Sequence, residues 1–293
     1  MAVPSKSGEH SSHSSDSAFS LHLPAQVESL SRELEDARLV DKNAYETVWK
    51  EIFQERENLI IGQREYGRQH KQRFLELLNA LVLLTRDKEN PKIIEFGISE
   101  FSAFYKRFKP GVLLHTVDRP TDDDYIGFTK KVCENVSGCA HHFEIDLHQP
   151  NAIPTQFGDH RRSYDLILFT EILEHLIINP VELLRELLDL LNDNGSLYLT
   201  TPNFYSRKNL DLIAARENPQ AVYPQRDGNW DAHHHFREYC AKELFEMIEK
   251  AGGKTTHFYF SDCWGDENSL TYPAEERENL VFVIQRGAHF LAS

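Results

Sequence analysis

The chain has 293 residues, of which 46 are acidic and 32 are basic, and its formal net charge is −14. This length fits one large domain with an appendage. The acidic balance argues against a protein whose main task is to grip the phosphate backbone of a nucleic acid.

Cysteine usage and hydropathy indicate a reducing, aqueous compartment. The longest apolar run, around residues 77–84, is far too short to span a bilayer. No charged-then-apolar signal segment opens the chain. The four cysteines show no Cys-x-x-Cys spacing, so reduced thiols are expected. We therefore expect a cytoplasmic protein with no membrane partner.

The first 90 residues divide into two parts. Residues 1–24 are rich in Ser and His and poor in large apolar side chains, which predicts a disordered tail. Over residues 25–90, apolar side chains recur at three- and four-residue spacing, which predicts a helical extension. Gly62 and Gly67 are expected to divide it into two or more helices. We expect this extension to act as a lid, and its helices are a candidate homodimer contact.

Residues 91–293 change to alternating strands and helices. Such alternation predicts βαβ units, and hence a doubly wound, Rossmann-like α/β catalytic domain with a parallel sheet. The expected strands are 92–96, 112–118, 142–146, 164–170, 196–200, 255–261 and 280–285.

Two helices of this domain have recognisable ends. One is expected to begin at Pro180, because Asn179 is a good N-cap and proline suits the first helical position. The pair Asn194-Gly195 is expected to end it. The other covers residues 241–250, where Cys240 is a poor N-cap residue and predicts a looser helix start.

The segment 204–234 is long and irregular, and loops of that length in compact domains are usually functional. Aromatic side chains on such a loop can build an acceptor pocket, and packing onto their own domain is an equally good interpretation. We interpret the segment as a substrate-side insertion, with His233 and His234 as exposed loop residues. Its aromatic residues include Phe204, Tyr205, Tyr223 and Trp230.

The most informative segment is residues 164–176, Tyr-Asp-Leu-Ile-Leu-Phe-Thr-Glu-Ile-Leu-Glu-His-Leu. Its apolar half is typical of a central parallel strand that is buried on both faces. Glu171, Glu174 and His175 then follow at i, i+3 and i+4, so a helix would place them on one face. Polar groups past the carboxyl end of such a strand lie where open α/β sheets bind ligands.

A ligand loop is expected where the first strand ends, in residues 93–102, Ile-Ile-Glu-Phe-Gly-Ile-Ser-Glu-Phe-Ser. Gly97 would let the backbone approach a ligand, and the N-terminus of the following helix would face it. Asp118 ends the second strand, 21 positions after Gly97. This is the spacing that recognition of ribose hydroxyls needs, in nicotinamide enzymes as well as in methyltransferases.

Taken in order, these segments resemble class I S-adenosylmethionine-dependent methyltransferases over roughly residues 70–286. The similarity is greatest to bacterial small-molecule and sugar-type members with a degenerate glycine loop. Ser99 and Phe101 stand at the second and third glycine positions of the E-x-G-x-G-x-G pattern. The resemblance implies a seven-stranded sheet whose last strand is antiparallel. The matching segments after the loop are 117–118, 144–147, 169–175, 197–203 and 235–239.

The resemblance also assigns the cofactor contacts. Read without it, Asp118 is a turn residue and Asp146 a helix cap. The implied contacts are Glu95, Gly97 and Ser99 for the methionine moiety, Asp118 for the ribose hydroxyls, Asp146 and Leu147 for the adenine, and Phe169 and Thr170 for the methionine end.

In two subgroups of this family a cluster of this kind holds a divalent cation. They are the small-RNA 3′-terminal 2′-O-methyltransferases and some ubiquinone-pathway O-methyltransferases. Here the implied ligands of Mg²⁺, Mn²⁺ or Zn²⁺ are Glu171, Glu174, His175 and, 60 residues later, His235. The alternative is a pocket wall without a metal, in which His175 or His235 takes the acceptor's proton. We place the catalytic groups among these two histidines and Glu171.

The sequence therefore predicts a methyltransferase that uses S-adenosylmethionine and methylates an oxygen, or less readily a nitrogen, of a small-molecule or sugar-like acceptor. Nucleic acid is not expected as a partner, because the chain is acidic and shows no RNA-binding module. Two alternatives stay open: a metal-dependent 2′-O-methyltransferase acting on an RNA terminus, and a catalytically silent scaffold, which the missing loop glycines motivate. A nicotinamide dehydrogenase would bind a dinucleotide at the same loop.

Overall fold

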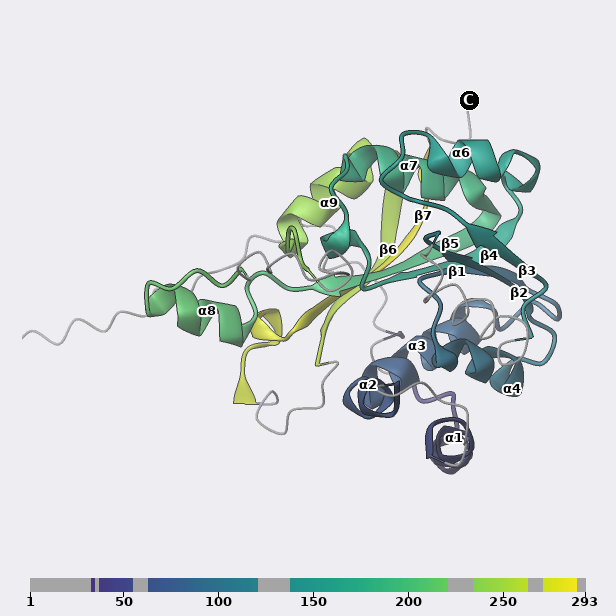
Figure 1. Ribbon diagram of the computed structural model, residues 1–293, viewed down its shortest axis with the longest axis horizontal. Helices are drawn as coiled ribbons and strands as arrows, with labels where there is room; N and C mark the ends of the chain where they lie inside the picture. Colours follow the sequence, from purple (N-terminus) through teal and green to yellow (C-terminus); the bar gives the residue numbers. More distant parts are fainter. Residues whose placement is uncertain are drawn as a thin grey trace, which may run out of the picture.

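The structure is a computed structural model that describes residues 33–34, 37–54, 63–120, 138–220, 234–262 and 271–288. The expected tail, residues 1–24, lies outside these ranges. At the centre is one seven-stranded sheet in the order β3-β2-β1-β4-β5-β7-β6 (Figure 1). Its strands are β1 Lys92–Phe96, β2 Leu113–Asp118, β3 His141–Glu144, β4 Tyr164–Thr170, β5 Leu191–Pro202, β6 Gly253–Ser261 and β7 Asn279–Arg286.

The direction of the strands confirms the expected fold class. Strands β1 to β5 pair in parallel, and β7 runs antiparallel to both β5 and β6. The result is a doubly wound α/β sheet with its antiparallel strand near one edge. Among the described residues, no helix is long and apolar enough to cross a bilayer.

Helices cover both faces of the sheet (Figure 1). Strand β4 is central, and Leu166, Ile167 and Leu168 are fully buried because each face of the sheet contacts a separate hydrophobic core. One core includes residues of α6 (Ala152–Gln156), α7 (Pro180–Leu190) and α9 (Ala241–Lys250). The other face carries α1 (Lys42–Trp49), η2 (Lys50–Gln54), α2 (Gln63–Gln69), α3 (Lys71–Leu84), η3 (Glu100–Phe104) and α4 (Tyr105–Phe108).

Helix α3 belongs to this second layer, although it lies within the stretch expected as a separate extension. Its buried residues Phe74, Leu77, Leu78 and Leu81 share one core with residues of β1, β2 and β4. The sheet face is apolar there, so it needs a helix to cover it. The amino-terminal helices are therefore continuous with the core of the sheet.

Helix α7 begins as expected and ends earlier than expected. The Asn179 side chain accepts a hydrogen bond from the Val181 amide at 3.1 Å. The helix ends at Leu190, so the expectation that Asn194-Gly195 ends it is wrong. Those residues lie inside β5, where a Cβ on Gly195 would meet the Tyr164 carbonyl oxygen at 2.5 Å. The glycine there permits a close approach of β5 to β4.

Gly67 lies inside α2 rather than at a helix boundary, and Gly62 is outside the described residues. A Cβ on Gly67 would lie 2.7 Å from Cδ1 of Phe53. Phe53 cannot easily move away, because its ring stacks on Trp49 with centroids 4.3 Å apart. The absence of a side chain at Gly67 therefore allows α2 and η2 to pack closely.

We expect Gly67→Ala to lower the free energy of unfolding. Alanine in a helix interior ordinarily gains about 1 kcal/mol over glycine, but overpacking a core costs about 1–3 kcal/mol. The clash with Phe53 should outweigh the gain, for a net loss of about 1–2 kcal/mol. Urea denaturation measures it. Gly158→Ala is the control, since no atom lies within 4 Å of its added Cβ. Equal or raised stability of Gly67→Ala would contradict the packing argument.

A histidine cluster lies at the amino ends of the strands, away from the expected ligand edge. His115 is buried, and its Nδ1 lies 2.9 Å from the Tyr164 hydroxyl. Burial, followed by the charges of Lys92, His160 and His141, lowers the pKa of His115 to about 4 from 6.5. The unfolded chain therefore binds a proton between these values that the native chain does not. Stability is complete above pH 6.5 and is lost as the pH falls toward 4.

His115→Gln tests this pH dependence, because glutamine does not titrate and can still bond the Tyr164 hydroxyl. Lowering the pH from about 7.5 to about 5 should depress the thermal midpoint of the wild type more than that of the variant. Differential scanning calorimetry at both pH values compares the two. Parallel shifts in the two proteins would show that His115 is not the group responsible.

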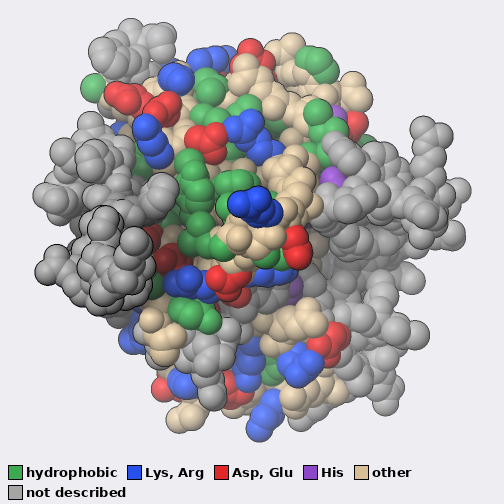
Figure 2. All heavy atoms as spheres, turned by 90° about the vertical axis from the view of Figure 1, so that its left-hand side faces the viewer, with side chains coloured by type: hydrophobic (Ala, Val, Ile, Leu, Met, Phe, Trp, Pro, Cys, Tyr) green, Lys and Arg blue, Asp and Glu red, His purple; other side chains and the backbone are tan. Residues whose placement is uncertain are grey.

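Helix α8 (Arg207–Ala214) stands apart from the main body (Figure 1). Arg207 joins it to the short helix η9 (Ala274–Glu276) through an ion pair with Glu276, and it also lies over the ring of Tyr272. Figure 2, which looks at this end of the molecule, shows acidic and basic side chains interspersed around a strip of hydrophobic ones. The described part of this face is thus not a uniformly basic surface.

Candidate active site at the carboxyl ends of the strands

The expected ligand loop follows β1. Gly97 has a φ of +74°, and its amide donates to the Val117 carbonyl at 2.9 Å. A Cβ at Gly97 would lie 3.2 Å from Cδ1 of Ile172. Glycine is needed here both for the left-handed conformation and for the narrow space. The loop therefore has the backbone shape that lets a ligand approach the end of β1.

Side chains take the places of the later glycines in this loop. Ser99 accepts a hydrogen bond from the Phe101 amide at 3.2 Å, and Ser102 Oγ lies 3.4 Å from the Ser99 amide. The two serines form a reciprocal cap at the start of η3. Phe101 is 1% exposed and packs in the core that contains α3. The residues that replace the two glycines, Ser99 and Phe101, therefore cap and anchor the start of η3.

Glu95 is buried beneath the loop, and both of its carboxylate oxygens are engaged within the protein. Ser102 Oγ donates to one and the Tyr105 hydroxyl to the other, each at 2.5 Å. Burial raises the pKa of Glu95 to about 7, although these two hydrogen bonds oppose the rise. In this structure Glu95 fixes η3 and α4, and its contact with the methionine moiety stays a prediction.

Asp118 ends β2 beside the glycine loop, as expected. Its Oδ1 accepts from the Arg119 amide at 2.8 Å, and burial raises its pKa to about 6. A carboxylate held by backbone amides next to Gly97 has the position and the acceptor capacity to bind two ribose hydroxyls. The loop and this carboxylate together fit a nucleoside-containing cofactor.

Asp146 and Leu147 follow β3, on the neighbouring strand. Asp146 accepts from the His148 amide at 3.0 Å and from Nε2 of Gln149 at 3.0 Å. The side chain thus organises its own turn, and it is not the N-cap of the next helix, because Asn151 is the N-cap residue of α6. Leu147 packs against the core from its rim. The adenine contact of these two residues stays a prediction.

At the end of β4, the side chains of Phe169 and Thr170 differ in their burial. Phe169 is fully buried and packs edge-on against Phe96, with centroids 5.5 Å apart. Its side chain belongs to the core of the sheet, and its contact with the methionine end of the cofactor stays a prediction. Thr170 is half-buried at the strand end, where it can border the methionine end of the cofactor.

Glu171 departs most clearly from the sequence-based expectation. Its φ is +55°, so the chain leaves β4 in a left-handed conformation before the 3-10 helix η6 (Leu173–His175) begins. Thr200 Oγ1 and Asn279 Nδ2 donate to its Oε1 at 2.6 and 2.8 Å. Its Oε2 lies 3.6 Å from Arg73 of α3. Glu171 therefore ties β4 to β5, β7 and α3, and the expectation that it shares one helix face with Glu174 and His175 is wrong.

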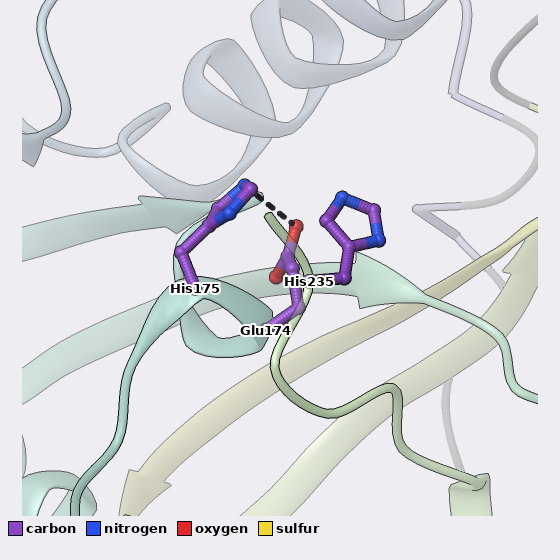
Figure 3. Close-up of side chains that lie close together, drawn as sticks. All are labelled: Glu174, His175 and His235. Atoms are coloured by element: carbon purple, nitrogen blue, oxygen red, sulfur yellow. Dashed lines mark ion pairs between the residues drawn. The ribbon is translucent and has the colours of Figure 1, made fainter. Parts of the chain in front are cut away.

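Three other expected residues do come together. Ligand atoms of Glu174, His175 and His235 all lie within 4.8 Å of one another (Figure 3). Glu174 is 1% exposed, and Thr201 Oγ1 donates to its Oε2 at 2.9 Å. Its Oε1 is buried, has no hydrogen-bond partner among the described residues, and lies 3.9 Å from Nε2 of His175. Burial, and then the nearby Glu171 carboxylate, raise the pKa of Glu174 well above its usual value.

Backbone hydrogen bonds bring His235 to this cluster. The Phe236 amide donates to the Glu174 carbonyl at 2.8 Å, and Nδ1 of His175 donates to the His234 carbonyl at 2.9 Å. His234 is 5% exposed, so the expectation that it is an exposed loop residue is wrong. His233 lies outside the described residues. These hydrogen bonds to η6 bring His235 beside His175, although 60 residues separate the two histidines.

Both histidines of the cluster have their Nδ1 protons fixed by an acceptor. Nδ1 of His175 bonds the His234 carbonyl, and Nδ1 of His235 lies 3.0 Å from Oε1 of Glu238. Since carbonyl and carboxylate oxygens only accept, each neutral ring carries its proton on Nδ1 and presents the Nε2 lone pair. Glu238 lies within the matching segment 235–239, but its contact with His235 could not be predicted from that motif.

The expected substrate-side insertion is only partly described. Phe204 lies at its start, where its amide donates to the Tyr239 carbonyl at 3.0 Å, and Tyr205 is 39% exposed. Tyr223 and Trp230 lie outside the described residues. An acceptor pocket built by this segment stays a prediction.

The fold and the loop define a Rossmann-like methyltransferase, and the comparisons with known proteins agree. A family model described as a methyltransferase domain matches residues 66–257, more than half of the chain. The chain therefore belongs to the methyltransferase domain family and is an S-adenosylmethionine-dependent methyltransferase. This membership favours an enzyme over a silent scaffold, and no finding favours an RNA terminus as the acceptor. A search of curated proteins gives no match.

Solved structures with a similar fold include three methyltransferases. The 1,6-didemethyltoxoflavin-N1-methyltransferase of Burkholderia thailandensis, with bound 1,6-didemethyltoxoflavin and S-adenosylhomocysteine, is 15% identical, with 86% of this chain and 93% of that one covered and a TM-score of 0.45. A putative S-adenosylmethionine-dependent methyltransferase from Listeria monocytogenes is 11% identical, with coverages of 74% and 98% and a TM-score of 0.48. A putative sarcosine dimethylglycine methyltransferase from Galdieria sulphuraria is 11% identical, with coverages of 76% and 88% and a TM-score of 0.47.

Proposed function

We propose that the enzyme transfers a methyl group to an oxygen of a small-molecule or sugar-like acceptor. Bound S-adenosylmethionine supplies a methyl group that is already electrophilic. The chain then has to align the acceptor and remove its proton. A neutral amine presents a free lone pair, whereas a hydroxyl is a weak nucleophile until its proton is removed. The observation that carries the proposal is the group of proton-accepting atoms in Glu174, His175 and His235.

For the same three residues we propose a divalent cation, Mg²⁺, Mn²⁺ or Zn²⁺. Ligand atoms of Glu174, His175 and His235 converge, and among the described residues the buried Oε1 of Glu174 accepts no hydrogen bond. A divalent cation could be bound by all three side chains. Histidines that ligate a metal typically donate a hydrogen bond from their other ring nitrogen to a carbonyl or a carboxylate, as His175 and His235 do here. Bound there, the ion would lower the pKa of an acceptor hydroxyl. Glu171 is not a ligand in this proposal, because its carboxylate is bonded to Thr200 and Asn279.

A panel of acceptors tests the proposed reaction. Purified enzyme is incubated with S-adenosylmethionine and either phenols, catechols and sugars or amines of matched size, and S-adenosylhomocysteine formation is measured. We expect turnover above the acceptor-free rate with hydroxyl compounds only. Turnover confined to amines would overturn the assignment of oxygen as the acceptor atom.

Elemental analysis tests the cation separately. Protein dialysed against each metal should retain about one equivalent, and a chelator should abolish turnover, which the same ion restores. Metal-free protein with full activity would refute the cation. His175 or His235 would then be the proton acceptor, and the proposed reaction would stand.

A further inference from the structure

The third glycine position of the cofactor loop is filled by Phe101, and a wall of aromatic side chains supports it. The ring of Phe101 stacks on Phe74 of α3, with centroids 4.1 Å apart and planes at 6°. On its other side it contacts Phe104, with centroids 4.5 Å apart. The start of η3 therefore packs directly on a helix from the amino-terminal part of the chain.

This packing continues to the first described helix. Phe53 lies nearly parallel to Phe74, with centroids 6.5 Å apart and planes at 11°, and it stacks on Trp49 at 4.3 Å. We call Trp49, Phe53, Phe74 and Phe101 the aromatic stack. All four side chains are less than 5% exposed. The aromatic stack therefore connects α1, η2 and α3 to the cofactor loop, on the face of the sheet that these helices cover (Figure 1).

The hydrogen bonds made by the serine side chains of the loop are local. Ser99 and Ser102 cap η3, and Ser102 and Tyr105 bond Glu95 at the end of β1. These contacts fix the inner side of the loop to its own strand. On the outer side, a glycine-rich loop would let helix and strand approach each other without any side chain. Here a phenylalanine occupies that place and requires a matching wall.

We propose that the aromatic stack positions the cofactor loop, with Phe74 as its central positioning residue. Phe74 holds Phe101, and Phe101 holds the backbone from Gly97 to Ser99 in the shape that receives S-adenosylmethionine. Phe53 and Trp49 keep Phe74 in place. The amino-terminal helices thereby contribute to cofactor affinity without touching the cofactor. The inference depends on the cofactor and not on the acceptor proposed above.

Isothermal titration with S-adenosylhomocysteine tests the inference without requiring an acceptor. An aromatic pair contributes about 0.5–1.5 kcal/mol beyond its buried area, so Phe74→Leu should weaken binding about three- to tenfold. Phe101→Leu should have a similar effect. The double variant should lose little more than either single one, because both remove the same contact. Additive losses would show that the two rings act separately and would overturn the positioning role.

A matched control separates positioning from general loss of stability. Phe245 of α9 lies in the opposite core, where its ring contacts Phe258 and Phe282 at 5.1 and 5.0 Å. Phe245→Leu should lower the thermal midpoint by a similar amount and leave cofactor affinity unchanged. If Phe74→Leu does not fold, Trp49→Phe is the milder variant, with a smaller loss of affinity expected. The inference would be refuted if a folded variant of the aromatic stack bound S-adenosylhomocysteine with wild-type affinity. It would also be refuted if Phe245→Leu lost as much affinity as Phe74→Leu.

Discussion

Glu174→Gln is expected to reduce methyl transfer about 10²–10⁴-fold while cofactor affinity stays within about twofold of the wild type. The substitution keeps the size of the side chain and an acceptor for the Thr201 hydroxyl, which donates to Glu174 at 2.9 Å. It removes a carboxylate whose charged form a cation or a protonated histidine would stabilise, and it leaves His175 and His235 beside a neutral amide. Without that charge the site neither retains a divalent cation nor stabilises a proton taken by a neighbouring histidine. Initial rates with the best hydroxyl acceptor of the panel, together with metal content, measure the effect.

Two controls make this result specific. Glu182→Gln removes an exposed carboxylate of α7 and should change neither rate nor metal content. Glu171→Gln is isosteric and lies three residues from Glu174, but its Oε1 can still accept from Thr200 and Asn279. We expect it to keep the metal and to lose stability, because Arg73 loses its charged partner. If Glu174→Gln kept full activity and full metal content, the Glu174 carboxylate would have no role in methyl transfer or in metal binding.

Most strands of the sheet could be predicted from the sequence because their signals are local, although β5 begins at Leu191, before the expected residue 196. The run from Tyr164 to Thr170 is apolar enough to be read as a buried strand, and β4 has those bounds. Asn179-Pro180 marks a helix start by the chemistry of two adjacent residues, and α7 begins there. These elements depend on neighbouring residues along the chain.

The site was harder to predict because contacts far apart in sequence decide it. The i, i+3, i+4 argument assumes a continuous helix through Glu171, but this residue adopts a φ of +55°. Bonds from Thr200 and Asn279, which are distant in sequence, hold it there. Likewise, Phe101 departs from the glycine pattern, and its place in the loop depends on the stacked ring of Phe74, which is distant in sequence. A motif gives the spacing of residues along the chain. The direction in which their side chains point depends on the backbone dihedral angles at single residues, such as Glu171.

Asp118→Ala is expected to weaken cofactor binding about 100-fold with no loss of stability. Two hydrogen bonds from ribose hydroxyls to a carboxylate contribute about 1.5–3 kcal/mol each. The lower limit of this range, about 3 kcal/mol for the pair, corresponds to a loss of affinity on the order of 100-fold. Without cofactor, the charge on the half-buried Asp118 carboxylate is unfavourable, because partial burial raises its pKa to about 6. The variant should therefore unfold at the same denaturant concentration as the wild type, or at a higher one. Asp146→Ala should have a smaller effect on affinity, because Asp146 already bonds His148 and Gln149.

The pH dependence of cofactor affinity provides a second measurement on the same residue. Burial raises the pKa of Asp118 to about 6, so the carboxylate is charged above that pH and protonated below it. A protonated carboxyl group accepts hydrogen bonds from hydroxyls less strongly. Wild-type affinity for S-adenosylhomocysteine should therefore fall as the pH drops below about 6, and Asp118→Ala should lose this component. Titrations across that range compare the two proteins. Parallel pH profiles would mean that another group recognises the ribose, and the assignment of Asp118 would fall.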